Sequence, residues 1–207
     1  MNYEIISAFI FASAALAISP GPDNLFVLTQ SMAYGKKYGL ATTAGLVSGC
    51  LVHTAFLAFG VSVIIAKDER LFFYIKLFGA IYLLYLAYKV VIRASFIDIG
   101  NSVAKKGLGA LFKQGFIMNV LNPKVTVFFL AFFPGFLFSS EINTVVQFFV
   151  LGGIFMVVTF LVFGLIALLS GGISRIIKKN ASLAFALKWL QITVFVGIAL
   201  YLLLSEK

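Results

Sequence analysis

The sequence predicts an all-α protein that crosses a membrane several times, and three observations indicate this fold class. Of the 207 residues, 62% are hydrophobic and only 11% are charged, a composition that excludes an ordinary soluble domain. The apolar residues gather in six runs, and a run of about 20 residues is long enough for a helix to cross a bilayer. Prolines interrupt the first and the fourth run. We therefore expect six transmembrane helices, of which the first and the fourth are broken.

The first run is expected to be a membrane span rather than a secretory signal. It lacks a basic start, it contains Glu4, and several more apolar runs follow it. The spans are predicted at residues 4–31, 38–66, 70–92, 109–138, 143–172 and 184–204. Of the links between them, including the fifth at 173–183, only the third, at 93–108, is long enough to be mobile. The whole chain, 1–207, is thus expected to form one transmembrane domain in the lipid bilayer.

The basic residues predict the orientation in the membrane. A net charge of +9 would suggest nucleic acid in a soluble protein, but here the basic residues lie in the links, so no nucleic-acid partner is expected. With six spans, eleven of the 16 Lys and Arg residues fall on one side and four on the other, and Lys124 lies within the fourth span. Because cytoplasmic loops are rich in basic residues, we place both termini outside. A five-span alternative with one re-entrant segment would move one terminus.

The segment at residues 19–24, Ser-Pro-Gly-Pro-Asp-Asn, breaks the first span. Proline removes a backbone donor and clashes with the preceding turn, so the helix must stop near Ser19 and start again. We expect Ser19 to be the N-cap of the second half and Pro20 its first residue. Irregular backbone at membrane depth is tolerated only where protein buries it or where it lines a watery cavity. The break therefore predicts a site, and a second break follows at 122–124.

The two halves of the chain resemble each other weakly but in the same order. The matched pairs are Pro20 with Pro123, Phe59-Gly60 with Phe163-Gly164, and 79–84 with 197–202. We therefore expect one repeat at about 1–93, a link at 94–108 and a second repeat at about 109–207. Because three spans are an odd number, the second repeat must enter the membrane from the opposite side. Such inverted repeats are common in secondary transporters, which bind their substrate at the bilayer midplane.

Asp23 and Lys124 are the ionisable residues deepest in the predicted spans, and each follows a break. A charge near the bilayer centre is costly, so it should face a cavity or a partner. The pair favours a site for a zwitterion. Asp23 and nearby helix-end carbonyls would receive an ammonium group, whereas Lys124 and the helix N-termini would receive a carboxylate. The alternative is a structural ion pair that clamps the two repeats together.

Polar amides and a histidine accompany the breaks. Asn24, Asn119 and Asn122 can bind a substrate or tie helices together, and for Asn122 an N-cap role is sufficient. His53 can relay protons together with Asp23, or it can be a neutral residue that is hydrogen-bonded within the bundle. His53 also continues a stripe of small residues at positions 41, 45 and 49. That stripe can pack the core of the monomer or serve a homodimer.

Together these segments resemble the lysine exporter family of LysE/RhtB type. The resemblance covers nearly the whole chain and rests on 18–24, on the small-residue span 39–53 and on 116–124. It implies a prokaryotic inner-membrane exporter of amino acids, such as basic amino acids, homoserine, threonine or leucine, with proton-driven antiport. It also implies that the family's motif residues fall on Ser19, Pro20, Gly21, Pro22, Asp23, Asn119, Asn122, Pro123 and Lys124.

Three other classes of function are weighed against this expectation. A cation exporter would be expected to offer more metal ligands than Asp23, His53 and Cys50. An enzyme is not expected, and neither is a cofactor or metal, because the chain has one cysteine, one histidine and no G-x-S-x-G motif. A membrane scaffold would have no reason to keep charges and helix breaks at mid-depth. Export by alternating access around Asp23 and Lys124 remains the leading hypothesis.

Overall fold

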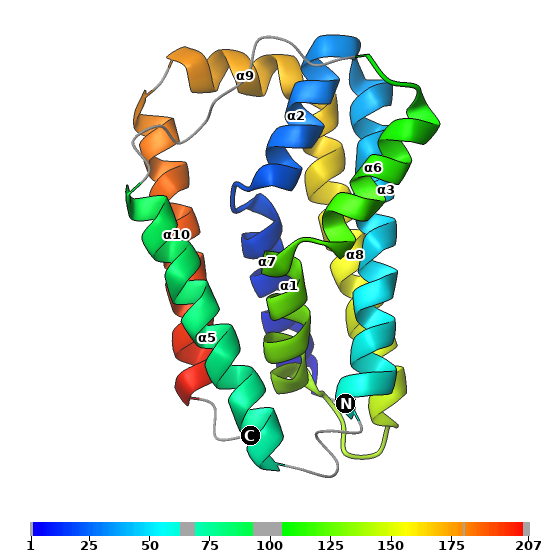
Figure 1. Ribbon diagram of the computed structural model, residues 1–207, viewed down its shortest axis with the longest axis vertical. Coiled ribbons are helices and arrows are strands. Elements are labelled where there is room, and N and C mark those ends of the chain that lie inside the picture. Colours follow the sequence, from blue (N-terminus) through cyan, green and yellow to red (C-terminus); the bar gives the residue numbers. More distant parts are fainter. Residues whose placement is uncertain (1, 63–68, 93–104, 180, 205–207) are drawn as a thin grey trace.

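The computed structural model describes residues 2–62, 69–92, 105–179 and 181–204, and its regular structure is helical throughout these ranges (Figure 1). This confirms the all-α prediction. The α-helices are α1 (Tyr3–Ile18), α2 (Pro22–Tyr34), α3 (Lys36–Phe56), α5 (Glu69–Ile92), α6 (Leu108–Val120), α7 (Pro123–Val127), α8 (Thr144–Leu168), α9 (Ser170–Lys179) and α10 (Ala181–Leu204). The π-helix η1 (Leu57–Val61) extends α3. The π-helix η2 (Phe128–Phe132) and the 3₁₀-helix η3 (Phe133–Phe136) extend α7.

Among the described residues, four helices are long and apolar enough to cross a membrane singly. They lie at Lys36–Val61, Arg70–Ile92, Thr144–Leu168 and Phe185–Leu204. Two further pairs qualify together but are bent: α1 with α2 by 59°, and α6 with the segment Pro123–Phe136 by 49°. If each bent pair is one span, the total is six, and the broken spans are the first and the fourth, as the sequence predicts.

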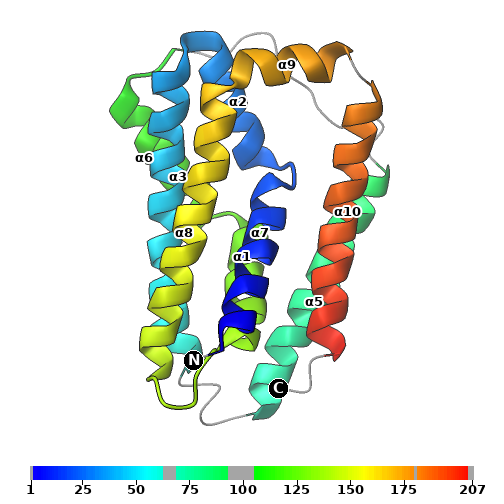
Figure 2. The same ribbon diagram turned by 180° about the vertical axis from the view of Figure 1, so that it is seen from behind.

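The predicted fifth link, 173–183, lies between the spans Thr144–Leu168 and Phe185–Leu204, and most of it belongs to the helix α9. This helix lies across one end of the bundle between α8 and α10 (Figures 1 and 2). Its sequence alternates isoleucines at 173, 176 and 177 with basic residues at 175, 178 and 179. That spacing is typical of an amphipathic helix that lies in the membrane interface. A link that is rich in basic residues is therefore compatible with helix.

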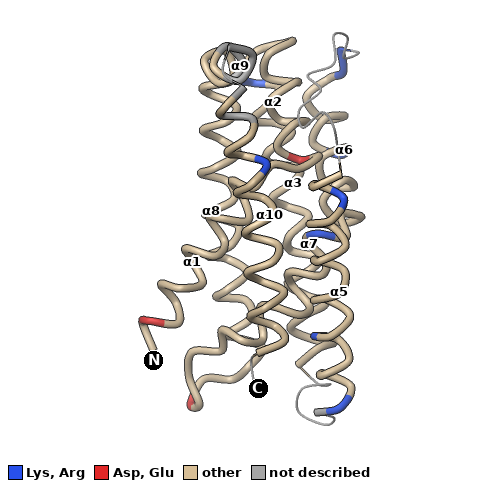
Figure 3. The backbone as a smooth tube through the Cα atoms, turned by 90° about the vertical axis from the view of Figure 1, so that its left-hand side faces the viewer, with Lys and Arg blue, Asp and Glu red and all other residues tan. Residues whose placement is uncertain are grey.

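The start of α1 and the end of α10 lie at the same end of the bundle (Figure 1). The α2–α3 junction, the start of α6 and α9 lie at the other end, as an even number of spans requires. Charged residues lie near both ends of the bundle, and a few lie between the ends (Figure 3). Lys36 and Lys37 start α3 at the end opposite the termini, while Lys67, Arg93 and Lys207, which also enter the predicted orientation, lie outside the described residues. The placement of the termini outside stays a prediction.

The helix pairing is compatible with an inverted repeat. The α1–α2 span and the α6–α7 span run in opposite directions (Figure 1). Helix α3 packs against α6, α8 against α1, α3 against α8, and α5 against α10, and α2 also packs extensively against α3. Exchanging the two halves of the chain leaves the first four pairs unchanged, whereas the α2–α3 pair has no comparable counterpart between α7 and α8 in the described residues. The symmetry itself and the repeat boundaries stay predictions.

The small-residue stripe of the second span packs inside the monomer. A Cβ on Gly45 would overlap the Phe112 carbonyl of α6, and one on Gly49 would lie 2.7 Å from Asn119 Oδ1. The glycines therefore allow α3 to approach α6 closely, which fixes the depth of the second break relative to α3. Because α6 covers the stripe, the stripe does not support a homodimer. The homodimer stays a prediction.

A layer of phenylalanines fills the bundle between the breaks and the end where the termini lie. Phe9 of α1, Phe128 and Phe129 of η2, and Phe133 of η3 are fully buried. The rings of Phe129 and Phe133 stack with their centroids 4.1 Å apart, and Phe9 meets Phe133 edge to face at 4.8 Å. Lipid tails are as apolar as these side chains, so tight van der Waals packing rather than hydrophobic burial stabilises the layer.

Candidate functional site

The first break lies two residues later than the sequence predicts. Ser19 ends α1, and its N–H donates to Ala15 O at 2.9 Å, whereas Gly21 is the N-cap of α2 and Pro22 its first residue. The prediction that Ser19 is the N-cap and Pro20 the first helical residue is thus wrong. A residue before proline is disfavoured in the α conformation. Gly21 precedes Pro22 and is extended. A helix that began at Pro20 would have to include Gly21 in the α conformation, so α2 begins only at Pro22.

The second break has the predicted cap. Asn122 is the N-cap of α7, Pro123 is the first helical residue, and Asn122 Oδ1 accepts the Lys124 N–H at 3.0 Å. Proline at this position loses nothing, since its missing N–H would have had no partner in the helix. Asn122 thus satisfies one of the backbone donors that the start of α7 exposes inside the membrane.

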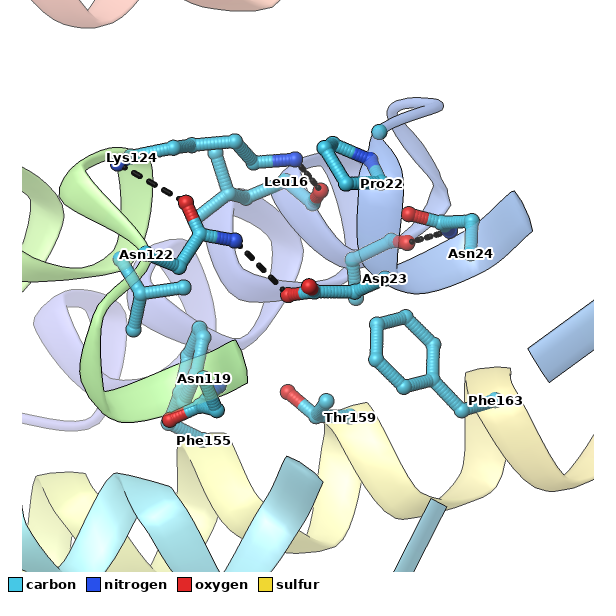
Figure 4. Close-up of a pocket in the computed structure, with 13 residues that line it drawn as sticks. Leu16, Pro22, Asp23, Asn24, Asn119, Asn122, Lys124, Phe155, Thr159 and Phe163 are labelled. Carbon is cyan, nitrogen blue, oxygen red and sulfur yellow. Dashed lines mark hydrogen bonds between the residues drawn. The ribbon is translucent and has the colours of Figure 1, made fainter. Parts of the chain in front are cut away.

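Asn122 also joins the two breaks. Its Nδ2 donates to Asp23 Oδ2 at 2.8 Å (Figure 4), although the residues are 99 positions apart in the chain. Asp23 lies in the first turn of α2 and is only 7% exposed. A carboxylate in the first turn is favoured by the helix dipole, which compensates part of the cost of its burial.

Lys124 reaches the end of the other broken helix. Its Nζ donates to Leu16 O at 3.3 Å and to Ser19 O at 3.2 Å, which are carbonyls that the end of α1 leaves without helical partners. The same ammonium lies 5.7 Å from the centroid of the Phe195 ring of α10. Between the described residues Asp23 and Lys124 there is no direct ion pair. The alternative of a structural ion pair between Asp23 and Lys124 is therefore wrong. Asn122 instead joins the two breaks, and carbonyls of α1 accept the hydrogen bonds of the lysine.

The two other amides make bonds within the bundle. Asn24 Nδ2 donates to Ala17 O at 2.7 Å and so ties α2 to the end of α1. Asn119 Oδ1 accepts a weak bond from Cys50 Sγ at 3.7 Å, and its backbone oxygen lies 3.1 Å from His53 Nε2. Because a carbonyl can only accept, Nε2 of His53 carries a proton. The histidine thus bonds to the backbone of α6 rather than to Asp23.

A small pocket lies where the breaks meet (Figure 4). Its volume is about 20 Å³, enough for about one water molecule and too small for an amino acid. It is lined by Leu16, Ala17, Gly21, Pro22, Asp23, Asn24, Asn119, Asn122, Lys124, Val125, Phe155, Thr159 and Phe163. The structure thus brings together all five residues predicted to bind substrate. Of the predicted break and relay residues, Ser19, Pro20, Pro123 and His53 do not line it.

The wall formed by α8 was missed by the sequence reasoning. Phe155, Thr159 and Phe163 lie four residues apart and so share one face of that helix. A signal for Thr159 existed, since it is the polar residue within the apolar stretch 154–163. No signal identified the two phenylalanines, because α8 is apolar on every side and its sequence favours no particular face.

The fold and this site define a polytopic membrane protein built around two broken helices that meet at a buried polar pocket. Comparison with known proteins then assigns the family. The family model described as LysE type translocator matches residues 14–206, and the chain belongs to this family. The resemblance seen in the motifs is therefore confirmed.

Similar proteins include named efflux proteins. The chain is 30% identical to the leucine efflux protein of Salmonella choleraesuis over 203 residues, which is 96% of this chain and 95% of the relative. It is also 30% identical to the homoserine/homoserine lactone efflux protein of Salmonella typhimurium over 152 residues, 73% of each chain. The uncharacterized membrane protein YrhP of Bacillus subtilis is 33% identical over 146 residues, 66% of this chain and 70% of the relative. No solved structure matches the chain.

Proposed function

We propose that this chain is a secondary active exporter of small amino acids, acting by proton antiport in a prokaryotic inner membrane. One observation carries the proposal: the two helix breaks meet at a pocket where Asp23 and Lys124 both point inward without pairing with each other. Opposite charges that are held apart in a buried polar pocket suit a zwitterion. Membership of the translocator family and the names of the efflux relatives support the same conclusion.

Each end of the zwitterion has a partner in this proposal. Asp23 receives the substrate ammonium, because its Oδ2 is bound by Asn122 while Oδ1 has no donor among the described residues. Lys124 receives the carboxylate, after exchanging one or both of its α1 carbonyl bonds for the substrate. Asn24, Asn119 and Asn122 complete the polar lining. The α1 carbonyls that Lys124 releases can then accept hydrogen bonds from the substrate ammonium.

The size of the pocket requires movement for transport. A volume of about 20 Å³ cannot hold an amino acid, so the described conformation is closed and substrate must enter through another. The breaks at 19–21 and 121–122 are the points where the spans already lack continuous helical bonding. Rotation of the half-helices about these breaks opens the pocket to one side and then to the other.

Proton coupling assigns a second role to Asp23. A proton on this carboxyl group competes with the substrate ammonium, so that inward proton movement drives export. His53 lies beside the pocket, where it bonds to the backbone carbonyl of Asn119. In this proposal it is a second site for the proton, although that carbonyl cannot itself transfer a proton from Asp23. In this proposal the end of the bundle that carries the basic links lies in the cytoplasm, and the end that carries both termini faces outward. The substrate leaves the pocket on the outward side.

Export of labelled amino acids tests the proposal directly. Cells are loaded with dipeptides, and efflux is compared at matched expression for the unchanged chain, Asp23→Asn, Lys124→Met and the control Glu141→Gln. Glu141 is an exposed carboxylate far along the chain from the pocket. We expect the unchanged chain and the control to export and both pocket variants to fail. Export of no amino acid by the unchanged chain, or normal export by both pocket variants, would refute the proposal.

A further inference from the structure

The hydroxyl group of Thr159 is buried in the pocket without a hydrogen-bond partner in the described part of the chain. The residue is 3% exposed, and its Oγ1 has neither donor nor acceptor there. Figure 4 shows this oxygen directed away from α8, towards the side of the pocket where Asp23 and Asn122 lie. A buried polar group without a partner is costly, and this one lies where the proposed substrate binds.

Among the buried hydroxyl groups without a partner in the described residues, which also include those of Ser13, Ser19 and Thr43, only that of Thr159 belongs to a residue that lines this pocket. Other buried hydroxyl groups on the helices avoid the cost by bonding locally. Thr42 donates to Tyr38 O at 3.0 Å, and Thr54 donates to Cys50 O at 2.9 Å. Each bond returns to the carbonyl four residues earlier, which is the usual local partner for Ser and Thr in a helix. The corresponding acceptor for Thr159 is the carbonyl of Phe155, and Thr159 does not use it. Its rotamer instead points the hydroxyl into the pocket.

The two walls of the pocket differ in chemistry. Asp23, Asn122 and Lys124, on α2 and α7, present the charged and amide groups that suit the ammonium and carboxylate common to all amino acids. The α8 wall presents the rings of Phe155 and Phe163 with the Thr159 hydroxyl between them (Figure 4). A substrate bound by its charged groups to the first wall therefore points its side chain at the second.

We propose that Thr159 determines specificity by hydrogen-bonding a hydroxyl group on the substrate side chain. The preferred substrates are then small amino acids with a side-chain hydroxyl, such as threonine and homoserine. This proposal rests on the proposed function, since it names the substrate class of the same pocket. A substrate of equal shape that lacks the hydroxyl leaves Thr159 buried and unpaired, which a site built to bond a hydroxyl discriminates against.

The test uses pairs of substrates that have nearly the same shape. Export of labelled threonine is compared with that of valine, and homoserine with norvaline, in the unchanged chain, Thr159→Val, Thr159→Ser and the control Thr42→Val. We expect the unchanged chain to prefer the hydroxylated member of each pair. Thr159→Val lowers that preference about three- to tenfold, the worth of one hydrogen bond, while Thr159→Ser and Thr42→Val retain it.

Two results would overturn the assignment of Thr159. If Thr159→Val lowers export equally for both members of each pair, the Thr159 hydroxyl binds the ammonium group that they share. If Thr159→Val leaves the preference unchanged, the Thr159 hydroxyl binds no substrate. Both results require that the unchanged chain exports at least one of the four amino acids. If the unchanged chain exports no amino acid at all, the proposed function fails, and the inference about Thr159 fails with it.

Discussion

Substitutions at Asn122 separate its two roles. Its side chain caps α7 through Oδ1 and bonds Asp23 through Nδ2. Replacing an N-cap by alanine costs about 1 kcal/mol, and a hydrogen bond to a charged group contributes about 1.5–3 kcal/mol. Asn122→Ala loses both, about 2.5–4 kcal/mol in total. Asn122→Ser keeps a capping oxygen but is too short to reach Asp23, so it loses only the second contribution.

Asn143 provides the matched control. It caps α8 by accepting the Val145 N–H at 2.8 Å and lies in an exposed turn. Asn143→Ala should therefore cost about 1 kcal/mol, and Asn143→Ser should cost almost nothing. The free energy of unfolding is measured for all four variants by SDS titration in mixed micelles. If Asn122→Ser is no less stable than Asn143→Ser, the bond to Asp23 contributes nothing and the reasoning about the joined breaks is refuted.

Three further predictions concern packing and orientation. Gly45→Ala pushes α3 away from a backbone carbonyl of α6 and should destabilise the chain by about 1–3 kcal/mol in the same titration, whereas Gly153→Ala, with open space around it, should not. Gln147→Leu removes four hydrogen bonds that hold the turn before α8, and faster proteolysis of that turn is expected. In a chain without its natural cysteine, a thiol reagent added outside should label Ser140→Cys but not Lys37→Cys; the reverse labelling would invert the orientation.

The sequence predicts the parts of the site that depend on local chemistry. Prolines dictate where the spans break, and buried charges must lie beside a polar cavity, so the sequence alone was sufficient to place Asp23 and Lys124 together. The cap differs from the prediction at Ser19, because Pro22 disfavours the α conformation at Gly21 and α2 therefore begins after Gly21. This restriction is local, so the sequence contains the information that positions the cap.

Other parts depend on packing between distant segments. The residues Phe155, Thr159 and Phe163 meet the breaks only because α8 packs against α1 and α2. A helix that is apolar all round carries no pattern that says which face turns inward. The partner of Lys124 was likewise not predictable, because opposite charges suggest an ion pair, whereas the ammonium bonds the carbonyls of Leu16 and Ser19.

The contacts that stabilise the closed site limit how tightly it can bind. Lys124 lies at the start of α7, where the helix dipole disfavours a cation, but it reaches the end of α1, where the dipole favours one. Asp23 in α2 likewise has a donor from the other half of the chain, Asn122. Each broken helix is therefore completed by the other half. In the proposed mechanism, a zwitterion replaces the bonds of Lys124 to the carbonyls of α1, while Asp23 Oδ1 and the Thr159 hydroxyl gain partners without losing any. Part of the binding energy is then offset by the bonds that are broken. Such an offset suits a carrier that must release its substrate in every cycle.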